Sequence, residues 1–309
     1  MSIWMEQLLT LPPQLPATTA ATVASTRAAA AVPPSDYAWA IGQALALLAA
    51  GLVIYLATYG RRPQGWAPAR IAATNGVTAP GLPLWVIGGA MILCFLAVPS
   101  LYLMSRGGTD RPASDAAQVL VYGATCAIGL MVAAALHWAF RRARTMHVLG
   151  LVPLRATLLP GRAAVAAAIA LPFTYLVTAL SLLAWQLLGF RHEPAHAMLQ
   201  LMERNAASPW VVWVTILNAT LLAPVFEEVL FRGHLQTALT AALPRSRWPA
   251  IVISSLLFAM LHDAWTAPAI FALSFAIGIA YEWTGSLWVA IAIHVTFNAV
   301  STAGFLMWR

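Results

Sequence analysis

Long apolar runs separated by short polar segments dominate the chain. The runs lie at Ala38–Tyr59, Leu82–Met104, Ala116–Phe140, Ala163–Leu188, Pro209–Ala242, Ala250–His262, Pro268–Trp283 and Ser286–Met307. About 20 helical residues, at about 1.5 Å each, cross the hydrocarbon core of a bilayer, so every run except the short sixth is long enough or nearly so. The pattern predicts an all-α fold, a polytopic membrane helical bundle of about eight transmembrane helices.

Composition strengthens this prediction and excludes other classes. The 309 residues are 61% hydrophobic and only 9% charged, which is far from the composition of a soluble domain. All 17 basic residues are arginines, and they lie mainly in loops, so the net charge of +7 does not indicate a nucleic-acid partner. Cys94 and Cys126 lack the spacing of a disulfide framework or a zinc-thiolate site.

Residues 1–37 differ from the rest because they are rich in proline, alanine and threonine. No basic segment precedes an uninterrupted apolar core, so we expect a flexible N-terminal extension with an interfacial anchor and not a cleaved signal peptide. The absence of lysine, with abundant alanine, proline and arginine, suggests a GC-rich coding bias, from which we expect a bacterial inner membrane. More arginines lie in the loops after the first, third and fifth runs, which predicts that both termini are non-cytoplasmic.

Three charged residues interrupt the fifth apolar run: Glu227, Glu228 and Arg232. A charge in the middle of a membrane helix costs about 2.5–3.5 kcal/mol on insertion scales, so three would cancel the insertion preference of the segment unless they face protein or trapped water. Ionisable residues at this depth indicate a functional site. The four runs within residues 38–208 hold few polar groups and are predicted to be scaffold.

Two further polar pairs follow within residues 209–309, the predicted catalytic domain. Phe258 and His262 end the sixth run, and His294 and Asn298 lie inside the eighth. Residues four apart share one face of a helix, so His294 and Asn298 can point at one target while Phe258 packs beneath His262.

These residues have the chemistry for attack of water on a peptide carbonyl. Glu228 and Arg232 form an i,i+4 pair in the favoured order, acid first. Adjacent helical residues project about 100° apart, so Glu227 does not share this pairing and is the candidate general base. His262 can hold the water. His294 and Asn298 can donate hydrogen bonds where an oxyanion develops.

The other histidines are weaker candidates for a functional site. His137 lies at a helix end and is expected to be interfacial, and His234, seven residues after Glu227, is expected to pack. A metal site within Arg191–Ser208, which contains His192, Glu193, His196 and Glu203, is a weaker interpretation than a polar loop or surface helix.

The ordered motifs EExxxR, FxxxH and HxxxN resemble the CPBP intramembrane proteases, which include the type II CAAX prenyl endopeptidases and bacteriocin-processing or self-immunity proteins. They stand here as Glu227–Arg232, Phe258–His262 and His294–Asn298. The resemblance covers about residues 209–300. It implies an endopeptidase in which Glu227 and His262 activate water, His294 and Asn298 form the oxyanion site, and Glu228 and Arg232 support the site or hold substrate.

The resemblance leaves cofactor and substrate open. No cofactor is expected; zinc bound by Glu227, His262 and His294 is possible but not favoured. The expected partners are the lipid bilayer and a membrane protein or lipidated peptide substrate, and the oligomeric state stays open. Two rival functions are a proton-coupled transporter, which would often show internal repeats, and a non-catalytic immunity or scaffold protein.

Overall fold

The computed structural model describes residues 34–60, 81–105, 114–139, 149–151, 159–190, 197–243 and 246–307, and these contain helices and no strands. The first four apolar runs form α3 (Pro34–Tyr55, continued by η1, Leu56–Gly60), α5 (Gly81–Ser105), α6 (Asp115–Ala139) and α8 (Leu159–Leu187). The first helix begins four residues before its predicted start. Residues 1–33, most of the predicted N-terminal extension, lie outside the described residues.

The fifth run is a single helical stretch of 34 residues that contains two π-helical segments. It comprises α10 (Pro209–Leu217), η3 (Asn218–Leu222), α11 (Ala223–Glu228), η4 (Val229–Gln236) and α12 (Thr237–Ala242), where η marks a π-helix. Pro224 has no N–H to donate and its ring crowds the preceding turn, which accounts for the wide η3 turn just before it. Widened turns of this kind often occur at functional sites.

Side chains stabilise the second wide segment. In η4 the ring Nδ1 of His234 lies 2.8 Å from the carbonyl oxygen of Val229, and the hydroxyl of Thr237 donates to the carbonyl of Arg232 over 2.8 Å. Each contact spans five residues, so these side chains satisfy carbonyls that the regular i→i−4 ladder does not.

The remaining helices are α9 (Ala197–Arg204), α13 (Trp248–Met260), α14 (Ala267–Thr284) and α15 (Leu287–Met307). Among the described residues, seven helices are long and apolar enough to cross a membrane, and α13 is a shorter apolar helix. The predicted all-α polytopic bundle is therefore confirmed, and α13 corresponds to the predicted sixth run, which was already short in the sequence.

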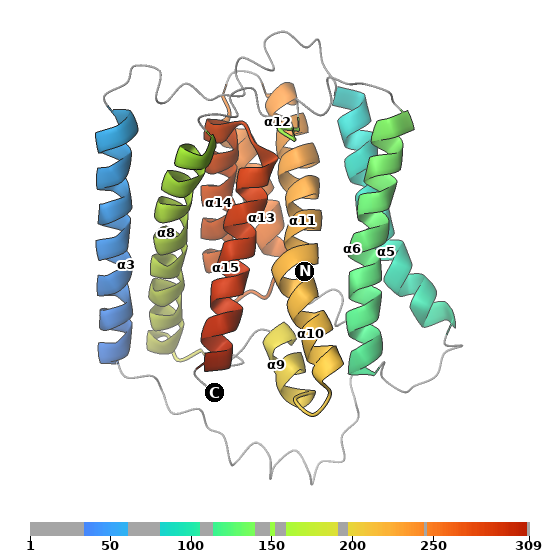
Figure 1. Cartoon of the computed structure of the whole chain (residues 1–309), viewed down its shortest axis with the longest axis horizontal. Coiled ribbons are helices and arrows are strands. Elements are labelled where there is room, and N and C mark those ends of the chain that lie inside the picture. Colours follow the sequence, from blue (N-terminus) through green and yellow to red (C-terminus); the bar gives the residue numbers. More distant parts are fainter. Residues whose placement is uncertain are drawn as a thin grey trace.

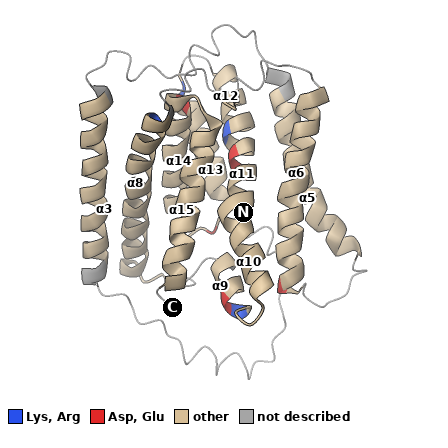
Figure 2. Ribbon diagram, in the orientation of Figure 1, with Lys and Arg blue, Asp and Glu red and all other residues tan. Residues whose placement is uncertain are grey.

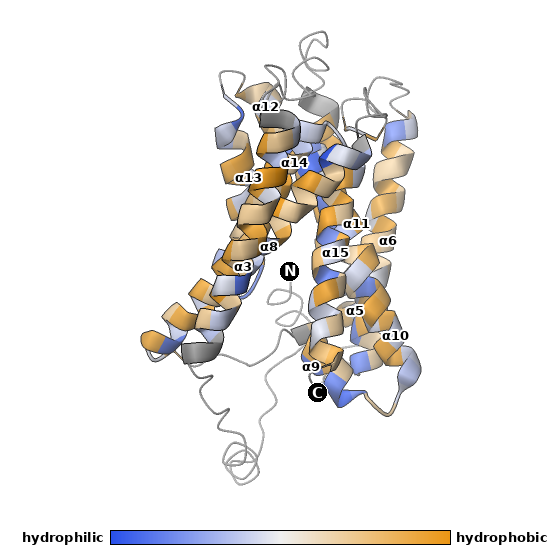
Figure 3. Cartoon of the chain, turned by 60° about the vertical axis from the view of Figure 1, so that its left-hand side comes forward, coloured by the Kyte–Doolittle hydropathy of each residue, from blue (hydrophilic) through white to orange (hydrophobic). Residues whose placement is uncertain are grey.

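The helical stretch Pro209–Ala242, hereafter the site helix, occupies the middle of the bundle (Figure 1). Stretches of it contact α6 and α5 on one side and α15, α13 and α14 on the other, while α3 packs on α8 and α8 packs on α14. Figure 2 shows that charged residues of the described helices gather on α11–η4 and near helix ends. The outer helices are coloured mainly as hydrophobic in Figure 3, and many large apolar side chains on them are exposed, as expected for surfaces that face lipid.

A second polar cluster joins the end of the site helix to α14. Gln236 donates to Glu282 over 3.0 Å and to the carbonyl of Gly278 over 3.2 Å, and Arg247 forms an ion pair with Glu282. This cluster holds the two helices in register one to two turns from the glutamates.

Two glycines form a tight corner where the segment before α8 meets the α14–α15 turn. Gly285 ends α14 in the left-handed conformation, and Gly150 has a φ of 73°, with its carbonyl accepting the N–H of Leu287 at 3.0 Å. A Cβ on Gly150 would lie 2.6 Å from the carbonyl oxygen of Gly285. Only glycine can adopt this positive φ and also leave room for the Gly285 carbonyl without strain.

Replacing Gly150 with alanine is expected to lower the free energy of unfolding by roughly 1–3 kcal/mol, because positive φ and the clash with Gly285 both oppose a side chain. Gly189→Ala is the matched control: its φ is 74° but no atom lies within 4 Å of the added Cβ. Thermal unfolding in detergent should show the larger loss for Gly150→Ala. Equal losses would show that the contact with Gly285 contributes nothing.

Candidate active site

Arg232 is a buried charge with partners on two helices. Its side chain is fully buried, its Nη1 donates to Glu228 Oε1 over 2.9 Å, and its Nη2 donates over 2.7 Å to both the carbonyl and the hydroxyl of Ser274. The guanidinium also lies 5.2 Å from the ring centre of Phe258. The Glu228–Arg232 pair predicted from spacing is thus present, and Ser274 on α14 is a partner that sequence reasoning missed. A lone hydroxyl in an apolar run was the signal available.

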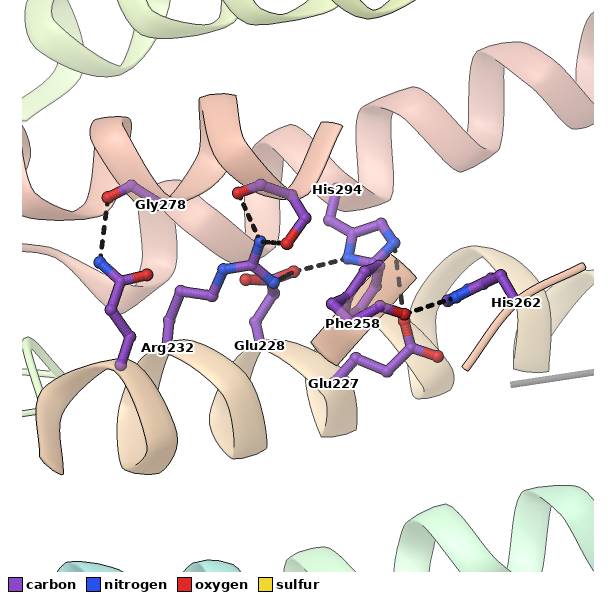
Figure 4. A network of polar contacts seen from close by, with 9 residues as sticks. Glu227, Glu228, Arg232, Phe258, His262, Gly278 and His294 are labelled. Atoms are coloured by element: carbon purple, nitrogen blue, oxygen red, sulfur yellow. Dashed lines mark hydrogen bonds and ion pairs between the residues drawn. The ribbon is translucent and has the colours of Figure 1, made fainter. Parts of the chain in front are cut away.

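His294 links α15 to both glutamates (Figure 4). Its Nδ1 lies 2.7 Å from Glu228 Oε1, while its Nε2 lies 3.8 Å from Glu227 Oε2. The first distance is a short hydrogen bond in which the ring nitrogen donates to the carboxylate. The second exceeds hydrogen-bonding distance, so Glu227 and the ring of His294 are close without a direct hydrogen bond. The structure therefore brings Glu227, Glu228, Arg232 and His294 together.

Phe258 lies at the centre of these side chains. Its ring is 2% exposed and contacts the rings of His262 and His294 at centroid distances of 4.9 and 5.9 Å. His262 Nδ1 lies 2.9 Å from the carbonyl oxygen of Phe258, which fixes the orientation of the imidazole. Figure 4 shows His262 at the end of α13, joined to Phe258 by this contact. The predicted packing of Phe258 beneath His262 is confirmed.

Asn298 lies one turn beyond His294 on α15 and contacts a different element. Its Nδ2 donates to the carbonyl of Ala219 in η3 over 2.8 Å. One amide N–H thus ties α15 to the wide turn, and a primary amide carries a second N–H. The structure anchors Asn298 beside the wide turn, and its predicted contribution to an oxyanion site stays a prediction.

Helix α6 also packs on α11, the segment that carries Glu227. Tyr122 and Cys126 on α6 are buried and belong to the same packed cluster as Phe226, the residue before Glu227. The sequence analysis treated this helix as scaffold, because a tyrosine and a cysteine in an apolar run carry no spacing signal. The site therefore draws on α6 as well as on the last third of the chain.

Two other sequence predictions have structural outcomes. His137 is half-buried near the end of α6 and its Nε2 lies 3.0 Å from Nε2 of His234, which is buried as expected for a packing residue. In the segment Arg191–Ser208, residues 197–204 form the short helix α9, while residues 191–196 lie outside the described residues.

The donor set for zinc does not assemble within the part of the chain that the structure describes. No group of three or more His, Cys, Asp or Glu side chains there is placed to hold a metal ion. His294 directs its Nδ1 to Glu228, and its Nε2 stands 3.8 Å from Glu227. The metal-free site expected from Glu227, His262 and His294 stays a prediction.

Comparison with known proteins identifies the same segment. Residues 209–300 match the family model described as type II CAAX prenyl endopeptidase Rce1-like, which confirms the predicted resemblance over that stretch. A protein of Bacillus subtilis (strain 168) named "Uncharacterized protein YpbD" is 39% identical over 90 residues, covering 28% of this chain and 42% of that protein. No solved structure matches. The match includes every residue of the three motifs and excludes α3, α5, α6 and α8.

Proposed function

We propose that this integral membrane protein is an intramembrane endopeptidase of the CAAX type. The observation that carries the proposal is the buried cluster of Glu227, Glu228, Arg232 and His294 in the middle of the bundle, inside the segment that resembles the type II CAAX prenyl endopeptidases. Buried ionisable groups from separate helices mark functional sites in membranes.

Glu227 acts as the general base in this mechanism. A water between Glu227 and His262 loses a proton to the Glu227 carboxylate, and the hydroxide oxygen attacks the carbonyl carbon of the scissile peptide bond. The C–N bond of the tetrahedral intermediate then breaks, and the proton held by Glu227 passes to the leaving amine. Atoms and charge balance without a metal ion, and a metal-free reaction is part of the proposal.

His294 and Asn298 stabilise the oxyanion of the intermediate. With Nδ1–H of His294 donating to Glu228, Nε2 faces Glu227 and the reacting groups, and it donates to the oxyanion from the doubly protonated ring. The second N–H of the Asn298 amide is the corresponding donor one turn away. Glu228 and Arg232 then serve as the rigid support that orients His294.

The substrate in this proposal is a membrane-associated protein or a lipidated peptide. The reacting groups lie on membrane-spanning helices, so a substrate chain must reach them within or at the edge of the bilayer. A bacterial inner membrane with both termini outside the cytoplasm is the proposed location.

Purified protein in liposomes is expected to cleave lipidated test peptides, and His262→Ala is expected to reduce kcat/KM by roughly 10²- to 10⁴-fold because the water loses its second partner. Chelator treatment and metal analysis on the same sample should leave activity unchanged and show no stoichiometric metal. His137→Ala is the control histidine variant. Activity that disappears with chelator and returns with zinc would contradict the metal-free mechanism, and proton flux that requires Glu227 would favour a transporter.

A further inference from the structure

The wide turn η3 leaves one backbone carbonyl of the site helix without its usual donor. In a regular α-helix the N–H of Ala223 would donate to Ala219, four residues earlier, but here it donates to Asn218, five residues earlier. The next residue is Pro224, which has no N–H. Of the two positions from which the helix could supply a donor to Ala219, the first is therefore committed to another carbonyl and the second has no N–H.

The side chain of Asn298 on α15 takes the place of that donor. Its Nδ2 donates to the Ala219 carbonyl over 2.8 Å, and α15 packs along η3. A backbone carbonyl only accepts hydrogen bonds, so this partner determines that Nδ2, and not Oδ1, faces the site helix. Because the amide group is planar, fixing one N–H also fixes the direction of the second. Asn298 is only half-buried, so a substrate can reach this second N–H.

A second asparagine holds the wide turn from the side of α6. Asn218 is 3% exposed and donates through Nδ2 to the carbonyl of Val119 over 2.9 Å. Gly123 on α6 makes room for it, because a Cβ there would lie 2.9 Å from Asn218 Oδ1. The turn is thus anchored between α6 and α15, and the Ala219 carbonyl has a fixed place from which to hold Asn298.

We propose that Pro224 is a positioning residue of the active site. By withholding an N–H from the helix it keeps the Ala219 carbonyl for Asn298, and this bond aims the second amide N–H at the oxyanion of the intermediate. The inference rests on the proposed function for the role of Asn298. Pro224 lies three residues before Glu227, so one turn of α11 carries the general base and also prepares the oxyanion site.

The test is the variant Pro224→Ala. Alanine suits a helix and supplies an N–H five residues after Ala219, so it competes with Asn298 for the carbonyl. This is the spacing that the bond from Ala223 to Asn218 already has. We expect kcat on a lipidated peptide to fall roughly 10- to 100-fold with KM nearly unchanged, since one donor of an oxyanion site contributes about 10²- to 10³-fold. The unfolding temperature should not fall, which separates this loss from destabilisation.

Pro99→Ala is the matched control, because Pro99 also lies inside a membrane-spanning helix, α5, outside the three motifs. This variant should keep the wild-type kcat. The double variant Pro224→Ala/Asn298→Ala should be no slower than Asn298→Ala alone, since Pro224 acts through the Asn298 amide. A proline that only supported the fold would add its loss to that of Asn298→Ala, and additive losses overturn the positioning role.

Nuclear magnetic resonance of protein with isotope-labelled asparagine supplies a readout that needs no substrate. The side-chain signals lost in Asn298→Ala identify this amide, and they should shift in Pro224→Ala but not in Pro99→Ala. Unshifted signals, or an unchanged kcat of Pro224→Ala where wild type cleaves peptide, overturn the role of Pro224 and leave the proposed function standing. If wild type cleaves nothing, the proposed function is overturned, and the signals still decide whether Pro224 keeps the Ala219 carbonyl for Asn298.

Discussion

Replacement of Glu227 by glutamine is expected to reduce peptide cleavage by roughly 10²- to 10⁴-fold, the contribution of a general base, while the protein stays folded. Glutamine keeps the shape and the polar contacts of the side chain but cannot take a proton from water. Folding should persist because the ring nitrogen of His294 is 3.8 Å from Glu227, so no short ion pair is lost. Initial rates on a lipidated peptide, with unfolding temperatures measured on the same sample, check both parts.

The exposed acid Glu203 on α9 provides the matched control, since Glu203→Gln makes the same chemical change away from the site. Full activity is expected for this variant. Cleavage by Glu227→Gln at the wild-type rate would remove Glu227 from the mechanism. If Glu227, His262 and His294 could each be replaced without any effect on cell phenotype or activity, a non-catalytic immunity or scaffold role would account for the protein better.

Replacement of Arg232 by methionine is expected to destabilise the protein by roughly 3–5 kcal/mol, the cost of leaving a buried charge without its partner. Methionine fills a similar volume, so packing alone does not explain the loss. Glu228 would lose the Arg232 bond of 2.9 Å inside a bundle where its side chain is fully buried, and both bonds to Ser274 would disappear. Unfolding in detergent and the yield of monodisperse protein measure the effect.

Two further variants separate charge from packing. Arg204→Met removes an exposed arginine that lies 3.5 Å from Asp115, and this surface pair should contribute no more than about 1 kcal/mol. The double variant Glu228→Leu/Arg232→Met removes both buried charges and should recover much of the stability lost by Arg232→Met. If the double variant were as unstable as the single one, unpaired charge would not be the cause.

Much of the site was predictable because its determinants are local. The i,i+4 spacing of Glu228 and Arg232 predicts the pair, and the face shared by Phe258 and His262 predicts their contact; both are present. The helices also lie within a few residues of their predicted ranges, since a run of about 20 apolar residues has one stable form in a bilayer.

Partners that come from other helices were not predictable in the same way. Ser274 on α14 and the buried residues of α6 lie in mainly apolar runs, and lipid tails are as apolar as the packed interior. The hydrophobic pattern of such a helix therefore does not tell which face points inward. The wide turns η3 and η4 likewise depend on how Pro224, His234 and Thr237 satisfy carbonyls in the folded chain.

The sequence by itself determined the membrane class, the helix order and the three motifs, because apolar length and helical spacing are properties of one segment at a time. The tertiary structure alone decided that His294 bonds Glu228 and not Glu227, that Arg232 is shared with Ser274, and that α6 packs on α11. Those outcomes depend on which helix faces meet. Glycines such as Gly123 and Gly129 set that meeting through close backbone approach, and their effect appears only once the neighbouring helix is in place.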